Sequence, residues 1–468
     1  MRVGCSVVLT IVLAFALVSK GRGDDGGPER IASMLAEKAL TNSGALEIVA
    51  DLTTEIGPRL AGSASEKRAA EWAKLRLEQL GFDKVWIETF PIEQGWARGM
   101  EMAEVVGPIR QPLVVTALGG SVATSAAGIE AEIALFKTYD DLLAAPVGSL
   151  TGKIAVVTQP IERTRDGSGY GPGSRLRGAG PVEAARRGAV AFLLRSPGTH
   201  SHRLAHTGVT RRATDVPRIP AAALSVPDVE QLERLVAKGN PVRIKLTLTP
   251  RDLGPVTSQN VIGEIKGRES PDEIVLLGAH LDSWDLGTGA LDDGAGVAMI
   301  MAATKLIRDL PQRPKRTIRV VLFGAEELGL FGGKAYAETH KLEASRHVVV
   351  TEPDIGQGPV YAFQTGVADP DESSLKQIRA ALSRLGIVAD NNQSRGSSDV
   401  SPLFELGVPA VTLRLDATDY FDFHHSADDT LDKIRPERIN QSTAAYAVFA
   451  YLAAELSGSY RATAGPTK

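Results

Sequence analysis

Apolar runs in the second half of the chain alternate with segments that have helical spacing. Three runs are apolar at nearly every position, which predicts strands buried on both faces; they span residues 273–279, 317–324 and 348–351. A further strand is predicted at 410–415. The predicted helices span 295–310, 373–385 and 438–456. This alternation predicts an α/β fold with a mixed, mostly parallel sheet covered by helices on both faces.

The first half of the chain has a different pattern. Residues 63–80 predict a helix that Ser63 or Ser65 can cap and that Gly81 ends. From about residue 112, short β-like runs alternate with loops rich in Gly, Pro and Arg; the runs span 131–136, 154–158, 189–194 and 242–248. The change predicts a β-rich domain, 112–255, inserted in a domain formed by 24–111 and 256–468.

Residues 1–23 predict a secretory signal peptide. Arg2 precedes an apolar run at 7–18, and a polar, Gly-rich stretch follows it. The run is short for a membrane span, which favours cleavage and secretion, extracellular or periplasmic, over an uncleaved anchor and predicts no stable membrane insertion. Cys5 is the only cysteine and lies before the run, so the mature chain would hold no disulfide and no cysteine ligand.

Length and charge narrow the function classes. The 468 residues are too many for one compact core, which agrees with two globular units. The net charge of -4, without a long block of like charge, gives no support for a nucleic-acid partner.

Histidine and carboxylate residues follow three of the predicted strands where each strand ends. They are His280 and Asp282 after the first, Glu326 and Glu327 after the second, and Asp354 after the third. The carboxyl edge of an open α/β sheet is where ligands bind. Asp292 stands before the helix that follows the first of these strands, and His425 lies in a later loop.

This mixture of imidazole and carboxylate suits a metal centre. Two histidines and three carboxylates exceed the three protein ligands of one catalytic zinc, but they suit two metals if one carboxylate bridges. The adjacent charges of Glu326 and Glu327 favour a cation bound to one of them, which leaves the other free to act as a base. Singly, each motif also fits a surface contact or a turn. The histidines at 200, 202 and 206 have no carboxylate nearby in sequence and are interpreted as a loop.

Several segments resemble the M28 family of zinc metallopeptidases, and within it the carboxypeptidase Q-like branch. The sequences LGAHLDSWDLGTGALDDGAG, FGAEELGLFGG and FHHSADDT carry the resemblance, at 277–296, 323–333 and 423–430. Segments at 56–63, 180–196, 206–208 and 216–225 extend it to about residues 30–458. The last three of these resemble the protease-associated (PA) insert, so the inserted domain is identified as PA-like.

The resemblance implies two Zn²⁺ ions and a role for each site residue. His280 and Asp354 would ligate one ion, Glu327 and His425 the other, Asp292 would bridge both, Asp282 would orient His280, and Glu326 would be the general base. The peptide bond between Asp292 and Asp293 would be cis. Some members carry a tyrosine just before the segment that corresponds to 397–399; none stands there, so the oxyanion donor stays open.

The implied activity is hydrolysis of dipeptides or short peptides by a secreted di-zinc exopeptidase, with a possible homodimer. Aminopeptidase activity stays open, because these motifs do not set the end preference. A glutaminyl cyclase type with one zinc and a receptor without metal ligands share the fold, but the complete ligand set argues against both. Six arginines of the insert could meet a substrate carboxylate or only solvate the surface: Arg163, Arg165, Arg175, Arg177, Arg186 and Arg187.

Overall fold

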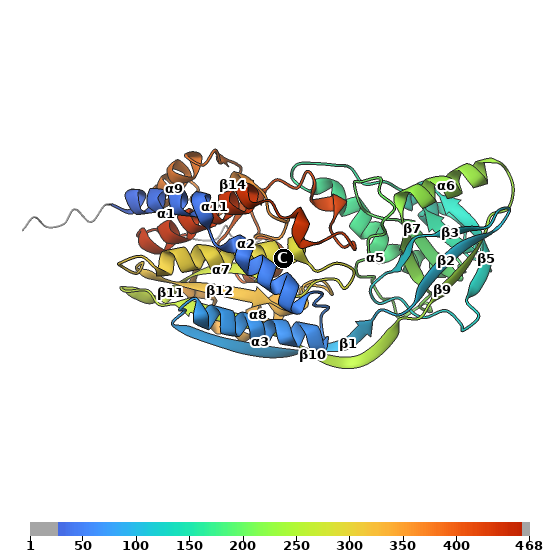
Figure 1. The fold of residues 1–468 in the computed structure, drawn as a ribbon, viewed down its shortest axis with the longest axis horizontal. Coiled ribbons are helices and arrows are strands. Elements are labelled where there is room, and N and C mark those ends of the chain that lie inside the picture. Colours follow the sequence, from blue (N-terminus) through green and yellow to red (C-terminus); the bar gives the residue numbers. More distant parts are fainter. Residues whose placement is uncertain (1–26, 461–468) are drawn as a thin grey trace, which may run out of the picture.

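The computed structural model describes residues 27–460, so the signal peptide predicted at residues 1–23 lies outside the described residues. The chain forms two eight-stranded sheets, which lie toward opposite ends of an elongated molecule (Figure 1). Within residues 27–460, no helix combines the length and apolar character needed to cross a membrane.

The first sheet is mixed, with parallel strands at its centre. Its strand order is β1 (Lys84–Ala97), β10 (Arg251–Ile265), β12 (Arg316–Phe323), β11 (Ser270–His280), β13 (His347–Thr351), β16 (Ala410–Leu415), β14 (Val360–Gly366) and β15 (Val388–Ala389). Strands β12, β11, β13 and β16 are parallel, whereas β10 and β14 flank them antiparallel. All of β12 is buried, as its apolar run predicts.

Helices cover both faces of this sheet, because alternate strand residues point to opposite sides. On one face, Val275 and Leu277 pack in a core with α1 (Pro28–Asn42), α2 (Ala45–Asp51), α3 (Ala64–Gln79), α7 (Ala295–Arg308), α9 (Ser373–Ser383) and α11 (Pro436–Glu455). On the other face, Ile274 and Leu276 pack against α8 (Phe331–Thr339) and α10 (Ser401–Glu405). The predicted two-sided cover is confirmed, and α3 is capped by Ser63 as expected.

The second sheet belongs to the inserted unit, residues 101–248. Its order is β3 (Gln111–Leu113), β2 (Glu101–Gly107), β9 (Arg243–Leu248), β5 (Ile129–Phe136), β6 (Ile154–Val157), β7 (Ala191–Arg195), β8 (Ala221–Leu224) and β4 (Val115–Ala117). Three helices accompany it: α4 (Tyr139–Ala144), α5 (Gly171–Arg186) and α6 (Val226–Ala237). The four strands predicted here correspond to β5, β6, β7 and β9. The antiparallel pair β1–β10 links the two units (Figure 1).

Two details of the insert differ from the sequence interpretation. The second sheet begins at Glu101 rather than near residue 112, because β2 pairs with β3 on one side and with β9 on the other. The Gly/Arg-rich stretch expected to be loop contains α5. This helix tolerates its glycines because they permit close packing: a Cβ on Gly180 would lie 2.4 Å from the Phe192 ring of β7.

Candidate metal centre

Three neighbouring parallel strands end beside one another at one edge of the first sheet. His280 is the last residue of β11, Glu326 and Glu327 follow β12, and Asp354 follows β13. Because the strands are parallel, their carboxyl ends meet at this edge, and the structure brings these side chains together there.

His280, Asp292 and Asp354 form the first half of the site. The Nε2 atom of His280 lies 3.2 Å from Oδ1 of Asp292 and 3.2 Å from Oδ1 of Asp354. The hydroxyl of Ser398 donates to the other oxygen of Asp354. All three residues offer one ligand atom within a span that suits a single metal ion.

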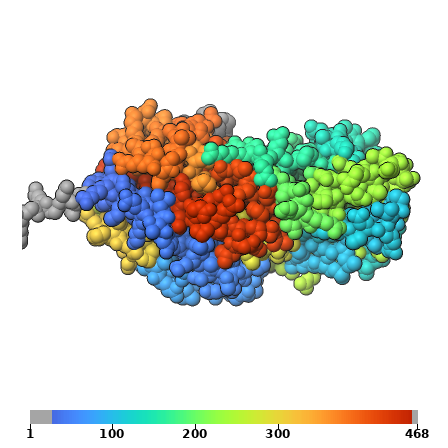
Figure 2. Space-filling view, turned by 45° about the horizontal axis from the view of Figure 1, so that its top comes forward, coloured from blue at the N-terminus to red at the C-terminus, as the bar shows by residue number. Residues whose placement is uncertain are grey.

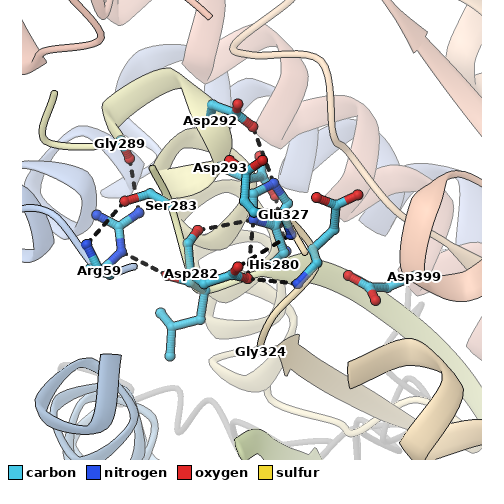
Figure 3. A network of polar contacts seen from close by, with 12 residues as sticks. Arg59, His280, Asp282, Ser283, Gly289, Asp292, Asp293, Gly324, Glu327 and Asp399 are labelled. Atoms are coloured by element: carbon cyan, nitrogen blue, oxygen red, sulfur yellow. Dashed lines mark hydrogen bonds and ion pairs between the residues drawn. The ribbon is translucent and has the colours of Figure 1, made fainter. Parts of the chain in front are cut away.

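The His280 ring contacts Asp282 mainly through the Asp282 backbone carbonyl rather than its carboxylate. Its Nδ1 lies 3.0 Å from the Asp282 carbonyl oxygen and 3.7 Å from the carboxylate. The carboxylate itself accepts the backbone N–H groups of Glu326, at 3.0 Å, and Glu327, at 3.3 Å (Figure 3). Asp282 therefore ties the end of β11 to the loop after β12, a contact that the sequence analysis did not anticipate.

His425, Glu327 and Asp292 form the second half. The Nε2 atom of His425 lies 2.9 Å from Oε2 of Glu327 and 3.2 Å from Oδ2 of Asp292. Asp292 thus directs one carboxylate oxygen toward each half, the arrangement that a bridging ligand needs. The peptide bond between Asp292 and Asp293 is cis, as the resemblance implied.

His424 is a neighbour that sequence reasoning left without a role. Its ring stacks on His425 with centroids 3.5 Å apart, and its Nε2 lies 3.6 Å from Asp292. Asp292, His424 and His425 also lie close enough together to hold a metal ion, in a group that omits Glu327. Oε1 of Glu327 and Nδ1 of His424 are both buried without a hydrogen-bond partner, so burial does not separate the two residues. We favour Glu327 because its Oε2 lies 2.9 Å from Nε2 of His425, whereas the Nε2 atom of His424 is 3.6 Å from Asp292.

The carboxyl groups of the site perturb one another strongly. Burial raises the pKa of Glu326 well above its usual value, and the charges of Asp354 and Glu327 add to this rise. Burial also raises the pKa of Asp399 to about 8. Burial would raise the pKa of Asp292 too, but hydrogen bonds with the site histidines hold it well below its usual value.

This donor set fits a bound cation. Besides Glu327, Asp292 has a carboxylate oxygen, Oδ2, that is buried without a well-aligned hydrogen bond. Several buried acids gathered in one place are costly unless positive charge offsets them. Imidazole and carboxylate together are the ligands that zinc accepts in proteins. The residues therefore fit bound zinc.

The second unit also lines the site. A cavity of about 620 Å³ is bordered by Asp292, Glu326, Glu327, Asp354 and His425 from the first unit, and by Tyr170, Arg177, Val209 and Arg211 from the insert. Tyr420 borders it as well. Sequence reasoning missed both tyrosines, because no motif or spacing relates either of them to the strand ends.

Only one of the six arginines considered above borders this cavity, Arg177 on α5. The other five have partners elsewhere: Arg163 with Asp422, Arg165 with Asp416, Arg175 over the Tyr139 ring, Arg186 with Asp215, and Arg187 with Glu183. For those five, a direct contact with substrate in the cavity is therefore not supported. Arg211, which the sequence analysis did not consider, takes their place beside Arg177.

Arg59 fixes the backbone around Asp292. It is fully buried and donates to the carbonyl oxygens of Leu281, Thr288 and Gly289, at 2.7, 2.7 and 3.0 Å. Figure 3 shows Arg59 close to Gly289. Asp429 accepts the backbone N–H of Asp292 at 3.2 Å. Both ends of the loop that carries Asp292 are therefore anchored.

Comparison with known proteins agrees with this geometry. The model of the family described as Peptidase family M28 matches residues 260–450. Carboxypeptidase Q of Mus musculus is 36% identical over 405 residues, covering 86% of this chain and 84% of the relative. A crystal structure of a peptidase M28 precursor from Shewanella amazonensis has 48% identity and a TM-score of 0.91, and covers 94% of this chain and 99% of that chain.

A more distant structure shows the fold alone. The zinc aminopeptidase BSAP from Bacillus subtilis is 23% identical, with a TM-score of 0.64, and the match covers 88% of this chain and 95% of that chain. The identity to carboxypeptidase Q over most of both chains, together with the strand-end cluster of acids and histidines, establishes that this protein belongs to peptidase family M28.

Proposed function

We propose that the protein is a di-zinc exopeptidase that hydrolyses dipeptides or short peptides with a free C-terminus. The observation that carries the proposal is the position of Asp292, with one oxygen facing His280 and the other facing His425. A carboxylate between two ligand groups supports a two-metal centre over a single-metal site.

Each site residue has a proposed task. His280 and Asp354 would hold one zinc, Glu327 and His425 the other, and Asp292 would contact both. Bound there, the zinc ions would supply an activated water and polarise the scissile carbonyl. Glu326 borders the cavity and is not needed as a ligand. Its raised pKa suits a group that takes a proton from the attacking water and returns it to the leaving amine.

The preference for a free C-terminus rests on the cations of the cavity. Arg177 and Arg211 are its only lysine or arginine lining residues within the described part of the chain. A guanidinium pairs well with a carboxylate, so these two side chains would bind the terminal carboxylate of a substrate. The carboxypeptidase Q relative supports the same choice.

Aminopeptidase activity is the second candidate, and a separate observation favours it. Aminopeptidase YwaD of Bacillus subtilis is 25% identical to this chain over 411 residues, which covers 85% of this chain and 82% of the relative. The two candidates differ in which end of the peptide is anchored.

A substrate panel separates the two. Purified enzyme would be assayed with one dipeptide in three forms: free at both ends, amidated at the C-terminus and acetylated at the N-terminus. Aminoacyl-nitroanilides complete the panel. We expect turnover of the free and acetylated dipeptides and slow turnover of the amidated form. Rapid cleavage of the amide and the nitroanilides, with none of the acetylated form, would establish an aminopeptidase instead.

We also propose three further properties of the protein. The inserted unit would be a PA-like domain, residues 1–23 would direct secretion, and the protein would form a homodimer. Light scattering would measure whether the protein is a dimer. N-terminal sequencing of the protein recovered from culture medium or periplasm would show whether the signal peptide is removed.

A further inference from the structure

We propose that His206, in the inserted unit, is a positioning residue of the metal centre. It holds the backbone beside His425 so that the Nε2 atom of His425 faces Glu327 and Asp292. The inference rests on the proposed function, because it takes His425 as a zinc ligand. It gives the insert a part in building the site, in addition to lining the cavity.

The insert binds the loop that carries His425 along much of its length. We call residues 416–425 the ligand loop. Two residues of the insert bind the middle of the loop: Arg163 contacts the Asp422 carboxylate at 2.6 Å, and Thr199 donates its N–H to the Phe421 carbonyl at 3.1 Å and its hydroxyl to Asp422 at 2.7 Å. Two more bind its end. The His206 ring lies 2.6 Å from the His424 carbonyl, and the Thr207 N–H donates to the His425 carbonyl at 2.9 Å. On the face drawn in Figure 2, the surface of the C-terminal segment meets that of the insert.

The hydrogen bonds around His206 determine which ring nitrogen carries its proton. The backbone N–H of His202 donates to Nδ1 of His200 at 2.8 Å, so the proton of a neutral His200 ring is on Nε2. That Nε2 lies 2.7 Å from Nε2 of His206 and donates to it. The proton of His206 is therefore on Nδ1, from which it is donated to the His424 carbonyl. Each step follows because a backbone N–H can only donate and a carbonyl can only accept.

His206 is fixed firmly in the insert. It is fully buried, and its backbone N–H donates to the Ser196 hydroxyl at 2.9 Å. A Cβ on Gly198 would lie 2.5 Å from its ring, so the glycine makes room for the imidazole. Next to it, the Thr207 hydroxyl donates at 2.8 Å to Ala117 of β4. The segment 206–207 thus connects the ligand loop to the second sheet.

The ligand loop needs such support at His425. Its φ is 59°, a left-handed conformation that a residue with a side chain seldom adopts without surrounding constraints. Its Nδ1 lies 3.3 Å from the Thr207 carbonyl oxygen and 3.4 Å from Nη1 of Arg177. An arginine can only donate, so with Nε2 bound to zinc the Nδ1 proton goes to Thr207. The two backbone bonds and this ring bond set both the place and the tautomer of the ligand.

A pair of amide variants tests the role of His206. The amide nitrogen of an asparagine can occupy the position of Nδ1, whereas that of a glutamine reaches only the position of Nε2. We expect His206→Gln to weaken the more loosely bound zinc about 10- to 100-fold, the usual effect of losing a group that orients a metal ligand. We expect His206→Asn to restore affinity to within about threefold of wild type. Zinc affinity is measured by competition with a chromophoric chelator, and zinc-free proteins are compared by thermal melting.

Asp228→Ala is the matched control. Asp228 is also buried in the insert, where it accepts the Ser225 hydroxyl at 2.8 Å and the Val114 N–H at 2.7 Å and pairs with Arg203; none of these contacts is to the ligand loop. It should lower the melting temperature of the zinc-free protein yet leave zinc affinity within about threefold of wild type. Equal zinc loss in Asp228→Ala and His206→Gln, or equal loss in both His206 variants, would overturn the proposal.

Wild-type protein gives a check that no folding defect can obscure. In zinc-loaded protein with ¹⁵N-labelled histidine, the His206 ring should show its proton on Nδ1; a proton on Nε2 would overturn the proposal. The same experiments distinguish failure of the proposed function from failure of the inference on His206. If wild-type protein binds no zinc, the proposed function fails; if wild type binds zinc and His206→Gln binds it equally well, only the inference on His206 fails.

Discussion

Glu326 and Glu327 are adjacent in the chain, yet they take different places in the site. Both border the cavity, but Glu327 contacts His425 directly, whereas Glu326 forms no ion pair with a site histidine among the described residues. The Asp282 carboxylate accepts the backbone N–H groups of both residues and so fixes the backbone that carries them. In the proposed mechanism, Glu327 would hold metal and Glu326 would move a proton.

Glu326→Gln should keep the metal and lose turnover. The amide fills the same space but cannot take a proton from water, so we expect kcat to fall about 10²- to 10⁴-fold or more with zinc content unchanged. Steady-state kinetics and metal analysis measure the two quantities. Glu338→Gln, on the exposed side of α8, is the control and should keep wild-type values. A Glu326→Gln enzyme with wild-type kcat would remove Glu326 from the mechanism.

Asp292→Ala should damage the whole centre, while His425→Ala should weaken one ion. The Asp292 carboxylate faces both halves, so its loss removes neutralising charge from two cations at once. Mass spectrometry of the native protein counts the ions in each variant. Two tightly bound zinc ions in Asp292→Ala would rule out a bridging role.

The sequence could predict which side chains meet where a histidine or an acid directly follows a predicted strand. His280, Glu327 and Asp354 stand directly after apolar runs, so the sheet geometry brings them together. His424 and Arg177 could not be placed this way, because their positions depend on packing between the two units rather than on local pattern.

Among the elements, the loop between β11 and α7 matters most, because it carries Asp292. Arg59, which precedes α3, donates to three carbonyl groups of this loop and to that of Gly57. The sequence predicted α3 with its cap, and it predicted β11 and α7, since each has a local signal. It did not predict α5, which is rich in glycine, or β2, because packing rather than a local sequence pattern stabilises these elements.

Arg59→Met should destabilise the protein strongly. The methionine fills similar space but leaves the buried carbonyl groups without donors, and breaking a buried charged network costs about 3–5 kcal/mol. Urea unfolding of the zinc-free protein measures the loss. Arg68→Met, at an exposed position of α3, is the control and should stay within about 0.5 kcal/mol of wild type. A change of similar size in both would show that the carbonyl contacts of Arg59 contribute little.

Over the whole molecule, the site lies where the two units meet. The first unit supplies the acids and histidines, and the insert supplies Tyr170, Arg177 and Arg211 around the same cavity. The sequence indicated two units and the chemistry of one of them. It could not indicate how they meet, because contacts such as that of His206 with His424 join positions far apart in the chain.

Arg177→Gln should change substrate preference. If its guanidinium binds the terminal carboxylate, KM for free dipeptides should rise about tenfold or more while amidated dipeptides are affected little. The ratio of kcat/KM for the two forms is the readout. Arg175→Gln, on the same helix but over the Tyr139 ring, is the matched control. An equal loss for both substrate forms would assign Arg177 to the structure of the site instead.

The number of zinc ions per chain tests the central claim most directly. Protein purified without chelators would be equilibrated with zinc, freed of excess metal and analysed by native mass spectrometry beside its Asp292→Ala variant. The account predicts two tightly bound zinc ions in the wild-type chain and fewer in the variant. A single ion in the wild type, or none, would contradict a di-zinc peptidase.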